Sequence, residues 1–86
     1  MIGAGFTNTD LNGCWLHIGG TGLSAIYENE DSGAQLIHYN NVWGLGPRWW
    51  TPDTSLANGY FGPSASELAG IYNAMSGGDT GIMYYG

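Results

Sequence analysis

Basic residues are almost absent from this sequence. Its 86 residues include no lysine and a single arginine, Arg48, against seven carboxylates, which gives a formal net charge of −6. A protein that binds nucleic acid needs several cations to displace the counterions of the phosphates. Anionic membrane surfaces also attract proteins through clustered Lys and Arg. The sequence therefore predicts that neither nucleic acid nor an anionic membrane is a partner of this protein.

Cysteine and long apolar runs are also scarce. Cys14 is the only cysteine, so no disulfide can form within the chain, and its place between Gly13 and Trp15 favours a buried, unreactive thiol. No run of apolar residues is long enough to insert into a membrane. Residues 1–6 have neither the basic nor the apolar region of a signal peptide. We expect synthesis in the cytosol, and a place in a virion or an extracellular assembly stays open.

The motifs of catalysis and metal binding are incomplete. His17 and His38 have no Cys or carboxylate at metal-ligand spacing. Residues 8–19 resemble the start of a calcium loop but lack its closing Glu, and the glycines of residues 19–22 lack the lysine of a phosphate-binding loop. No nucleophile elbow is present. The sequence predicts a protein that is not an enzyme and has no cofactor and no metal.

Glycine and aromatic residues are abundant instead. The chain has 16 Gly, four Trp, six Tyr and two Phe, whereas only 9% of its residues are charged. Turn signals recur about every ten residues, as in an antiparallel β-meander. Asn40 and Asn41 suit a tight turn with positive φ. The strands expected from these signals are 13–18, 23–29, 34–39, 42–45, 60–61 and 81–86.

The period of the apolar residues changes after residue 63. Ser64 and Glu67 have the spacing of a capping box. Apolar residues then recur at i, i+3, i+4 and i+7: Leu68, Ile71, Tyr72 and Met75. This pattern predicts a helix over about 65–75, ended by Gly77 or Gly78. The expected fold is one mainly β domain over residues 1–86, a small antiparallel β-meander sheet or sandwich with one short C-terminal helix.

Glycines and aromatic residues of the first half follow a recognisable order. They are Gly3-Ala4-Gly5, Asn12-Gly13-Cys14-Trp15, Gly22, Tyr27, Ile37-His38-Tyr39 and Val42-Trp43. Over about residues 2–47 this order resembles a short β-rich repeat of uncharacterised phage, bacterial and algal proteins, with the signature Gly-Ala-Gly followed by Asn-Gly-Thr-Tyr. Cys14 and Trp15 replace the usual Thr and Tyr, and the repeat has no C-terminal helix. The resemblance implies a compact antiparallel unit of surface or virion proteins, without catalytic residues.

Two functions are compatible with the aromatic residues. A short, weakly charged sheet protein has strand edges that no lysine protects, which favours self-association. We therefore expect a structural subunit that pairs with copies of itself, or with other protein subunits, through sheet edges and aromatic patches. The candidate interface residues are Trp43, Arg48, Trp49, Trp50, Asp53, Tyr60, Tyr84 and Tyr85.

The alternative is a small carbohydrate-binding module. Trp49 and Trp50 would stack on sugar rings, while Asp53, Asn40 and Asn41 would bind the hydroxyls. Many of the aromatic residues must also fill the core, because Leu, Ile and Val are few. The sequence does not decide which aromatic residues are exposed.

Overall fold

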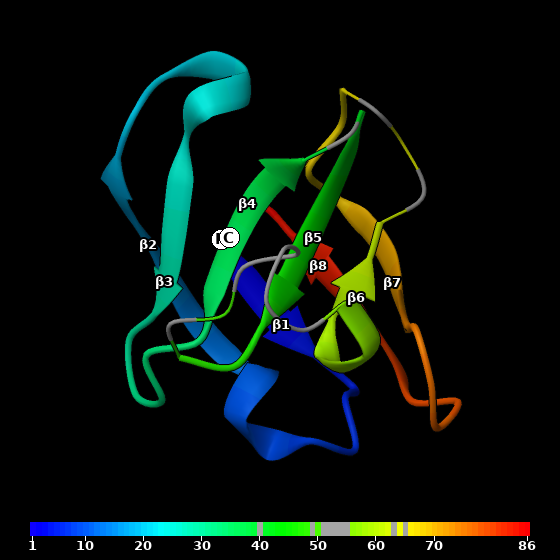
Figure 1. Ribbon diagram of the computed structural model, residues 1–86. Coiled ribbons are helices and arrows are strands. Elements are labelled where there is room, and N and C mark those ends of the chain that lie inside the picture. Colours follow the sequence, from blue (N-terminus) through cyan, green and yellow to red (C-terminus); the bar gives the residue numbers. More distant parts are fainter. Residues whose placement is uncertain (40, 49, 51–55, 63, 65) are drawn as a thin grey trace.

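Eight antiparallel strands form a closed barrel in the computed structural model, which describes residues 1–39, 41–48, 50, 56–62, 64 and 66–86. The strands are β1 (Ile2–Ala4), β2 (Gly13–Gly19), β3 (Ile26–Asn29), β4 (Gln35–Tyr39), β5 (Val42–Gly46), β6 (Tyr60–Phe61), β7 (Gly70–Ala74) and β8 (Thr80–Tyr84). Each strand pairs with the next along the chain, and β1 pairs with β8 to close the barrel (Figure 1). Short 3-10 helices lie between strands: η1 (Thr9–Leu11), η2 (Gly22–Ser24) and η3 (Leu56–Asn58).

Large side chains fill the interior of the barrel. Alternate residues of each strand point inward, and the strand residues at most 2% exposed include Trp15, Trp43, Tyr72, Leu36, Leu45 and Met83. Leu11 of η1 is buried with them. The indole N–H of Trp15 donates to the Leu11 carbonyl at 3.0 Å. A Cβ atom on Gly3 would lie 2.3 Å from that carbonyl oxygen. A glycine in β1 therefore lets β1 lie directly against η1 and the Trp15 ring.

A second apolar cluster lies on the outer side of β5 and β6. Gly46 points away from the interior because Leu45 points into it, and a Cβ atom on Gly46 would lie 2.3 Å from Cγ of Trp50. The ring centre of Trp50 is 6.1 Å from that of Phe61. Trp50 is only 2% exposed. The segment after β5 therefore folds back and covers this outer surface with an indole ring.

The helix predicted for residues 65–75 is wrong. Ser64 Oγ accepts the backbone N–H groups of Ser66 and Glu67, each at 3.2 Å, so the capping pattern forms a local turn. Residues 70–74 are strand β7, in which Ile71 is 55% exposed and Tyr72 is fully buried. Residues 70–73 pair with β8, and Asn73 and Ala74 pair with β6. This pairing of the β7 backbone outweighs the helical spacing of its apolar residues.

Other expectations from the sequence are partly confirmed. The mainly β, antiparallel meander order is confirmed, and Asn41 has the expected positive φ of 61°. The expected meander sheet or sandwich is instead a closed barrel, because the short strand β1, which was not predicted, pairs with both β2 and β8. Residues 22–24 form η2 instead of the start of a strand. Gly77 and Gly78, with φ of 91° and 74°, lie in the β7–β8 turn.

Candidate functional site

An apolar surface lies on the outer side of β7, β8, β1 and β2, beside the exposed polar residues Asn73 and Thr80, and we call it the outer apolar face. Its residues are Ile71, Ile82, Tyr84, Ile2, Ala4, Cys14 and Leu16. Strand register places Ile82 between Ile71 and Ala4 in one row. Residues directly opposite each other share a side of the sheet. The apolar side chains therefore form continuous rows across neighbouring strands.

A second row lies beside the first. Ile2 of β1 is opposite Tyr84 of β8 and opposite Cys14 of β2, and Leu16 follows on the same side of β2. The exposed fractions are 55% for Ile71, 47% for Leu16 and 43% for both Ile82 and Tyr84. None of these seven residues is charged. The described residues thus leave these four side chains open to solvent, whereas Ile2, Ala4 and Cys14 are half-buried.

Most of the predicted aromatic interface residues are not on this face. Trp43 is buried in the barrel, where its ring lies 5.0 Å from that of His38. Its indole nitrogen has no hydrogen-bond partner among the described residues. Trp50 is buried as well. Exposed aromatic side chains remain at Tyr84 and at Tyr85, which is 64% exposed beyond the end of β8.

The polar residues predicted for the site lie elsewhere. The aliphatic part of Arg48 packs against Gly33 in the β3–β4 turn. Asn41 is exposed in the β4–β5 turn. Asn40, Trp49 and Asp53 lie outside the described residues. Because Trp50 is buried, it cannot offer its ring to a sugar as the carbohydrate hypothesis required.

Sequence reasoning missed the aliphatic residues of the outer apolar face. Met83 lies within the strand predicted for residues 81–86, and its burial between Ile82 and Tyr84 shows that both neighbours point outward. The alternation was visible in residues 80–84. Its meaning depended on β1, because Ile2 and Ala4 join the exposed residues of β8 to those of β2.

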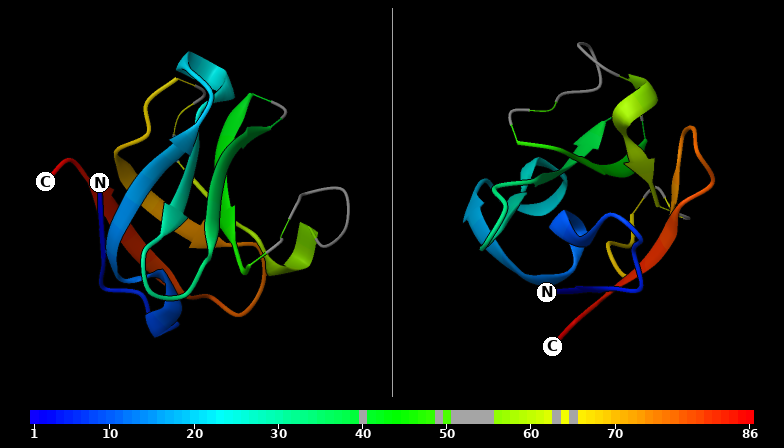
Figure 2. Two further views of the ribbon diagram at one scale, coloured as in Figure 1. Left: turned by 90° about the vertical axis from the view of Figure 1, so that its left-hand side faces the viewer. Right: turned by 90° about the horizontal axis from the view of Figure 1, so that it is seen from below.

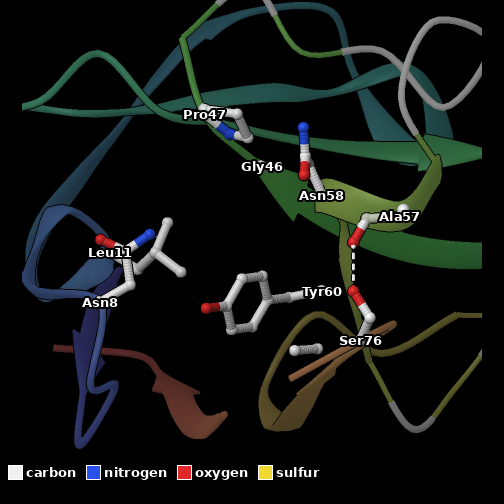
Figure 3. A pocket seen from close by; sticks show the side chains of 9 residues that line it. Asn8, Leu11, Gly46, Pro47, Ala57, Asn58, Tyr60 and Ser76 are labelled. Atoms are coloured by element: carbon white, nitrogen blue, oxygen red, sulfur yellow. Dashed lines mark hydrogen bonds between the residues drawn. The ribbon is translucent and has the colours of Figure 1, made fainter. Parts of the chain in front are cut away.

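An open pocket of about 290 Å³ lies at one end of the barrel and is called the end pocket here. It is formed by η1, the end of β5, η3, the start of β6 and the β7–β8 turn. Its lining residues are Asn8, Leu11, Gly46, Pro47, Ala57, Asn58, Tyr60, Ala74 and Ser76. Figure 3 shows the Tyr60 side chain among them, directed toward Leu11 and Asn8.

A hydrogen-bonded carboxylate fixes the wall of the end pocket. Asp79 accepts the Tyr60 hydroxyl at 2.7 Å and the backbone N–H groups of Thr7 and Asn8 at 2.8 and 3.0 Å. The N–H groups of Asn8 and Thr7, with the Tyr60 hydroxyl, lower the pKa of Asp79 to about 2. Burial, and then the neighbouring Asp79, raise the pKa of Tyr60 to about 12. At neutral pH Asp79 is therefore charged and Tyr60 is a neutral hydrogen-bond donor.

In the part of the chain that the structure describes, no three His, Cys, Asp or Glu side chains gather as a metal ion would require. No helix among the described residues has the length and apolar character needed to cross a bilayer.

Comparison with known protein families, with characterised proteins and with solved structures finds no match to this chain. The resemblance over residues 2–47 therefore stays a prediction.

Proposed function

We propose that this protein is a non-enzymatic structural subunit that associates with copies of itself through the outer apolar face. The supporting observation is the pair of uncharged rows on β7, β8, β1 and β2, which include four side chains that are 43% to 55% exposed. A continuous exposed apolar patch commonly marks a protein contact.

Contact through an uncharged face allows a second copy to be the partner despite the net negative charge of the chain. Two chains of net charge −6 repel one another, and the repulsion is smallest where no charged side chain is brought together. A two-fold contact places the same patch on both sides. Ile2 lies in the second row, between Tyr84 and Cys14, and none of these three residues is charged. Glu28 of β3, opposite Leu16, lies at the edge of the face.

The contact uses side chains instead of strand edges. Closure of the barrel leaves no free edge between β1 and β8. The outer apolar face is four strands wide, at about 4.8 Å per strand, and about five residues long, at about 3.3 Å per residue. Its footprint is therefore roughly 300 Å². Stable dimers bury about 800 Å² on each partner. The pairwise contact is therefore weak, and it acts best where many copies are held close together.

A virion or another ordered surface assembly provides such crowding. That location depends on the resemblance over residues 2–47, whereas the self-association depends on the outer apolar face. The two parts of the proposal can therefore fail separately.

The experiment is light scattering behind a sizing column over a wide range of protein concentration. The mass is expected to rise with concentration for the native chain. Ile82→Lys places a charge in the middle of the face and should keep the protein monomeric. Thr21→Lys, at an exposed position in the β2–β3 connection, adds the same charge outside the face and should associate like the native chain.

Alkylation of Cys14 gives a second measurement. Cys14 lies in the second row of the face and is partly exposed, so association should slow its reaction with a thiol reagent. A native chain that stays monomeric up to millimolar concentration would contradict the proposal. Equal association of the Ile82→Lys variant would contradict the choice of face.

A further inference from the structure

We propose that the end pocket is a binding site for one neutral sugar ring. This site is separate from the outer apolar face, so the inference does not depend on self-association. It also differs from the sugar platform expected from the sequence, because Trp50 is buried on the outer side of β5.

The size of the end pocket limits the ligand to a single ring. Ligand pockets usually have volumes of about 300 to 1,000 Å³, and the end pocket, at about 290 Å³, is at the lower limit. Its open side leaves room for a substituent to extend into solvent. A terminal monosaccharide of a longer glycan fits this description, whereas an extended oligosaccharide could not be enclosed.

The walls of the pocket are fixed before any ligand binds. The Tyr60 ring packs edge-to-face against Phe6 with centroids 5.5 Å apart, and Asp79 holds its hydroxyl. The Ser76 hydroxyl donates to the Ala57 carbonyl at 3.2 Å and joins the β7–β8 turn to η3 (Figure 3). The Met75 backbone N–H donates to the Gly59 carbonyl at 2.9 Å. A fixed pocket loses little conformational entropy when a ligand enters.

Polar groups in the pocket retain hydrogen-bonding capacity. The exposed Asn58 side chain is not used in any hydrogen bond among the described residues, and its amide can donate and accept at once. Ser76 uses its hydroxyl proton on Ala57, which leaves the oxygen free to accept. An amide beside a hydroxyl oxygen complements neighbouring sugar hydroxyls, which are also both donors and acceptors.

The remaining lining favours a neutral ligand. Leu11, Pro47 and Ala74 offer apolar surface to the C–H groups of a sugar ring. None of the described residues that line the pocket is charged, and Asp79 lies just behind Tyr60. An anionic sugar would have no cationic partner among the lining residues and would be repelled by this carboxylate. The pocket chemistry therefore selects a neutral hexose or N-acetylhexosamine.

The test is a titration of the 15N-labelled chain with neutral monosaccharides, followed by amide chemical shifts. The probes are glucose, galactose, mannose and N-acetylglucosamine, with glucuronate as the anionic comparison. At least one neutral sugar should shift the side-chain amide signals of Asn58 and Asn8, with an affinity of order millimolar, as expected for a small ligand. Glucuronate should bind at least about tenfold more weakly.

Two variants locate the site. Asn58→Ala should weaken binding of the same sugar by about tenfold or more, the effect of losing a hydrogen-bonding group that recognises a hydroxyl. Asn73→Ala removes an exposed amide on the outer side of β7, away from the pocket lining, and should bind like the native chain. Absence of shifts with every neutral sugar, equal binding by Asn58→Ala, or preference for glucuronate would overturn the inference.

Discussion

The hydroxyl of Tyr60 donates a hydrogen bond of 2.7 Å to the carboxylate of Asp79. The same carboxylate accepts two backbone N–H groups from residues 7 and 8, more than 70 positions earlier in the chain. It therefore joins β6, the β7–β8 turn and the segment after β1. Asp79→Ala should lower the free energy of unfolding by about 1–2 kcal/mol, because it leaves these donors without their acceptor. Urea unfolding measures the change.

The control for this variant is Glu30→Ala. Glu30 is an exposed carboxylate in the β3–β4 turn, so its removal changes the net charge equally and should alter stability little. Equal effects of both substitutions would mean that charge, and not the hydrogen bonds of Asp79, determines the result.

The Tyr60–Asp79 pair also predicts opposite pH dependences. The folded pKa of Asp79, about 2, is below its ordinary value, so the stabilisation by this group is complete at neutral pH and is lost as the pH falls toward 2. The folded pKa of Tyr60, about 12, is raised, so its stabilisation is complete below pH 10 and is lost as the pH rises toward 12. Urea midpoints measured across pH test both limits. In Asp79→Asn the dependence at acid pH should be reduced, and an unchanged acid limb would assign it to other carboxylates.

Because Gly46 lies in close contact with Trp50, adding one methyl group at residue 46 should strongly lower the stability of the protein. Gly46→Ala places Cβ 2.3 Å from Cγ of Trp50, so either the indole ring or β5 must move, at a cost of about 1–3 kcal/mol or more. Gly19→Ala in β2 is the matched control, because a Cβ atom there meets nothing within 4 Å. Urea unfolding and the tryptophan emission wavelength measure the effects. Equal stabilities of the two variants would contradict the packing of Trp50 on β5.

Replacing each of the two buried tryptophans Trp15 and Trp43 by Phe should lower the stability of the protein by different amounts. Trp15→Phe loses ring volume and the hydrogen bond to the Leu11 carbonyl, whereas Trp43→Phe loses ring volume and a donor that has no partner among the described residues. The Trp15 variant should therefore be less stable by about 1 kcal/mol. Thermal and urea unfolding of both variants measure the difference. The reverse order would indicate that a buried water satisfies the Trp43 indole.

The observed structure and the helix predicted from the sequence differ in how deeply they bury Tyr72 and Met75. Both residues lie on one side of the predicted helix, but in the structure Tyr72 is fully buried in β7, whereas Met75, just after β7, is 50% exposed. Tyr72→Ala should cost about 3–5 kcal/mol, whereas Met75→Gln should cost less than about 0.5 kcal/mol. If Tyr72→Ala fails to fold, Tyr72→Phe, which loses only the hydrogen bond to the Leu68 carbonyl, keeps the comparison measurable. Comparable losses for Tyr72→Phe and Met75→Gln would support the helix.

The sequence was informative where local patterns match the fold. Glycine and asparagine turns gave the positions of β2, β4, β5, β6 and β8 closely, because each turn has its own backbone requirement. The helical period of residues 68–75 misled because Ile71 is apolar although it faces outward. A strand with apolar residues on both sides loses the alternation that identifies it. β1 could not be recognised because three residues give too short a pattern.

The sites were harder to predict than the strands. Whether an aromatic residue points inward depends on register. The burial of Trp50 depends on the glycines of β5 and on Gly59, which follows η3, because they make room for its ring. The outer apolar face joins residues from both ends of the chain, and no local pattern contains that pairing. The end pocket likewise combines Asn8 with Asn58 and Ser76. Neither surface corresponds to a motif in the sequence.

Because β1 pairs with β8, every strand of the barrel has a neighbour on both sides, including the first and the last strand of the chain. Residues 2 and 84 lie opposite each other, Gly86 packs against Ile2, and the two ends of the chain lie on the same side of the molecule (Figure 2). A short linker between the ends and a new opening at Gly77–Gly78 would give a circular permutant with the same neighbours for every strand. For the same reason, a host protein could carry this barrel inside one of its surface loops without moving the flanks of that loop apart.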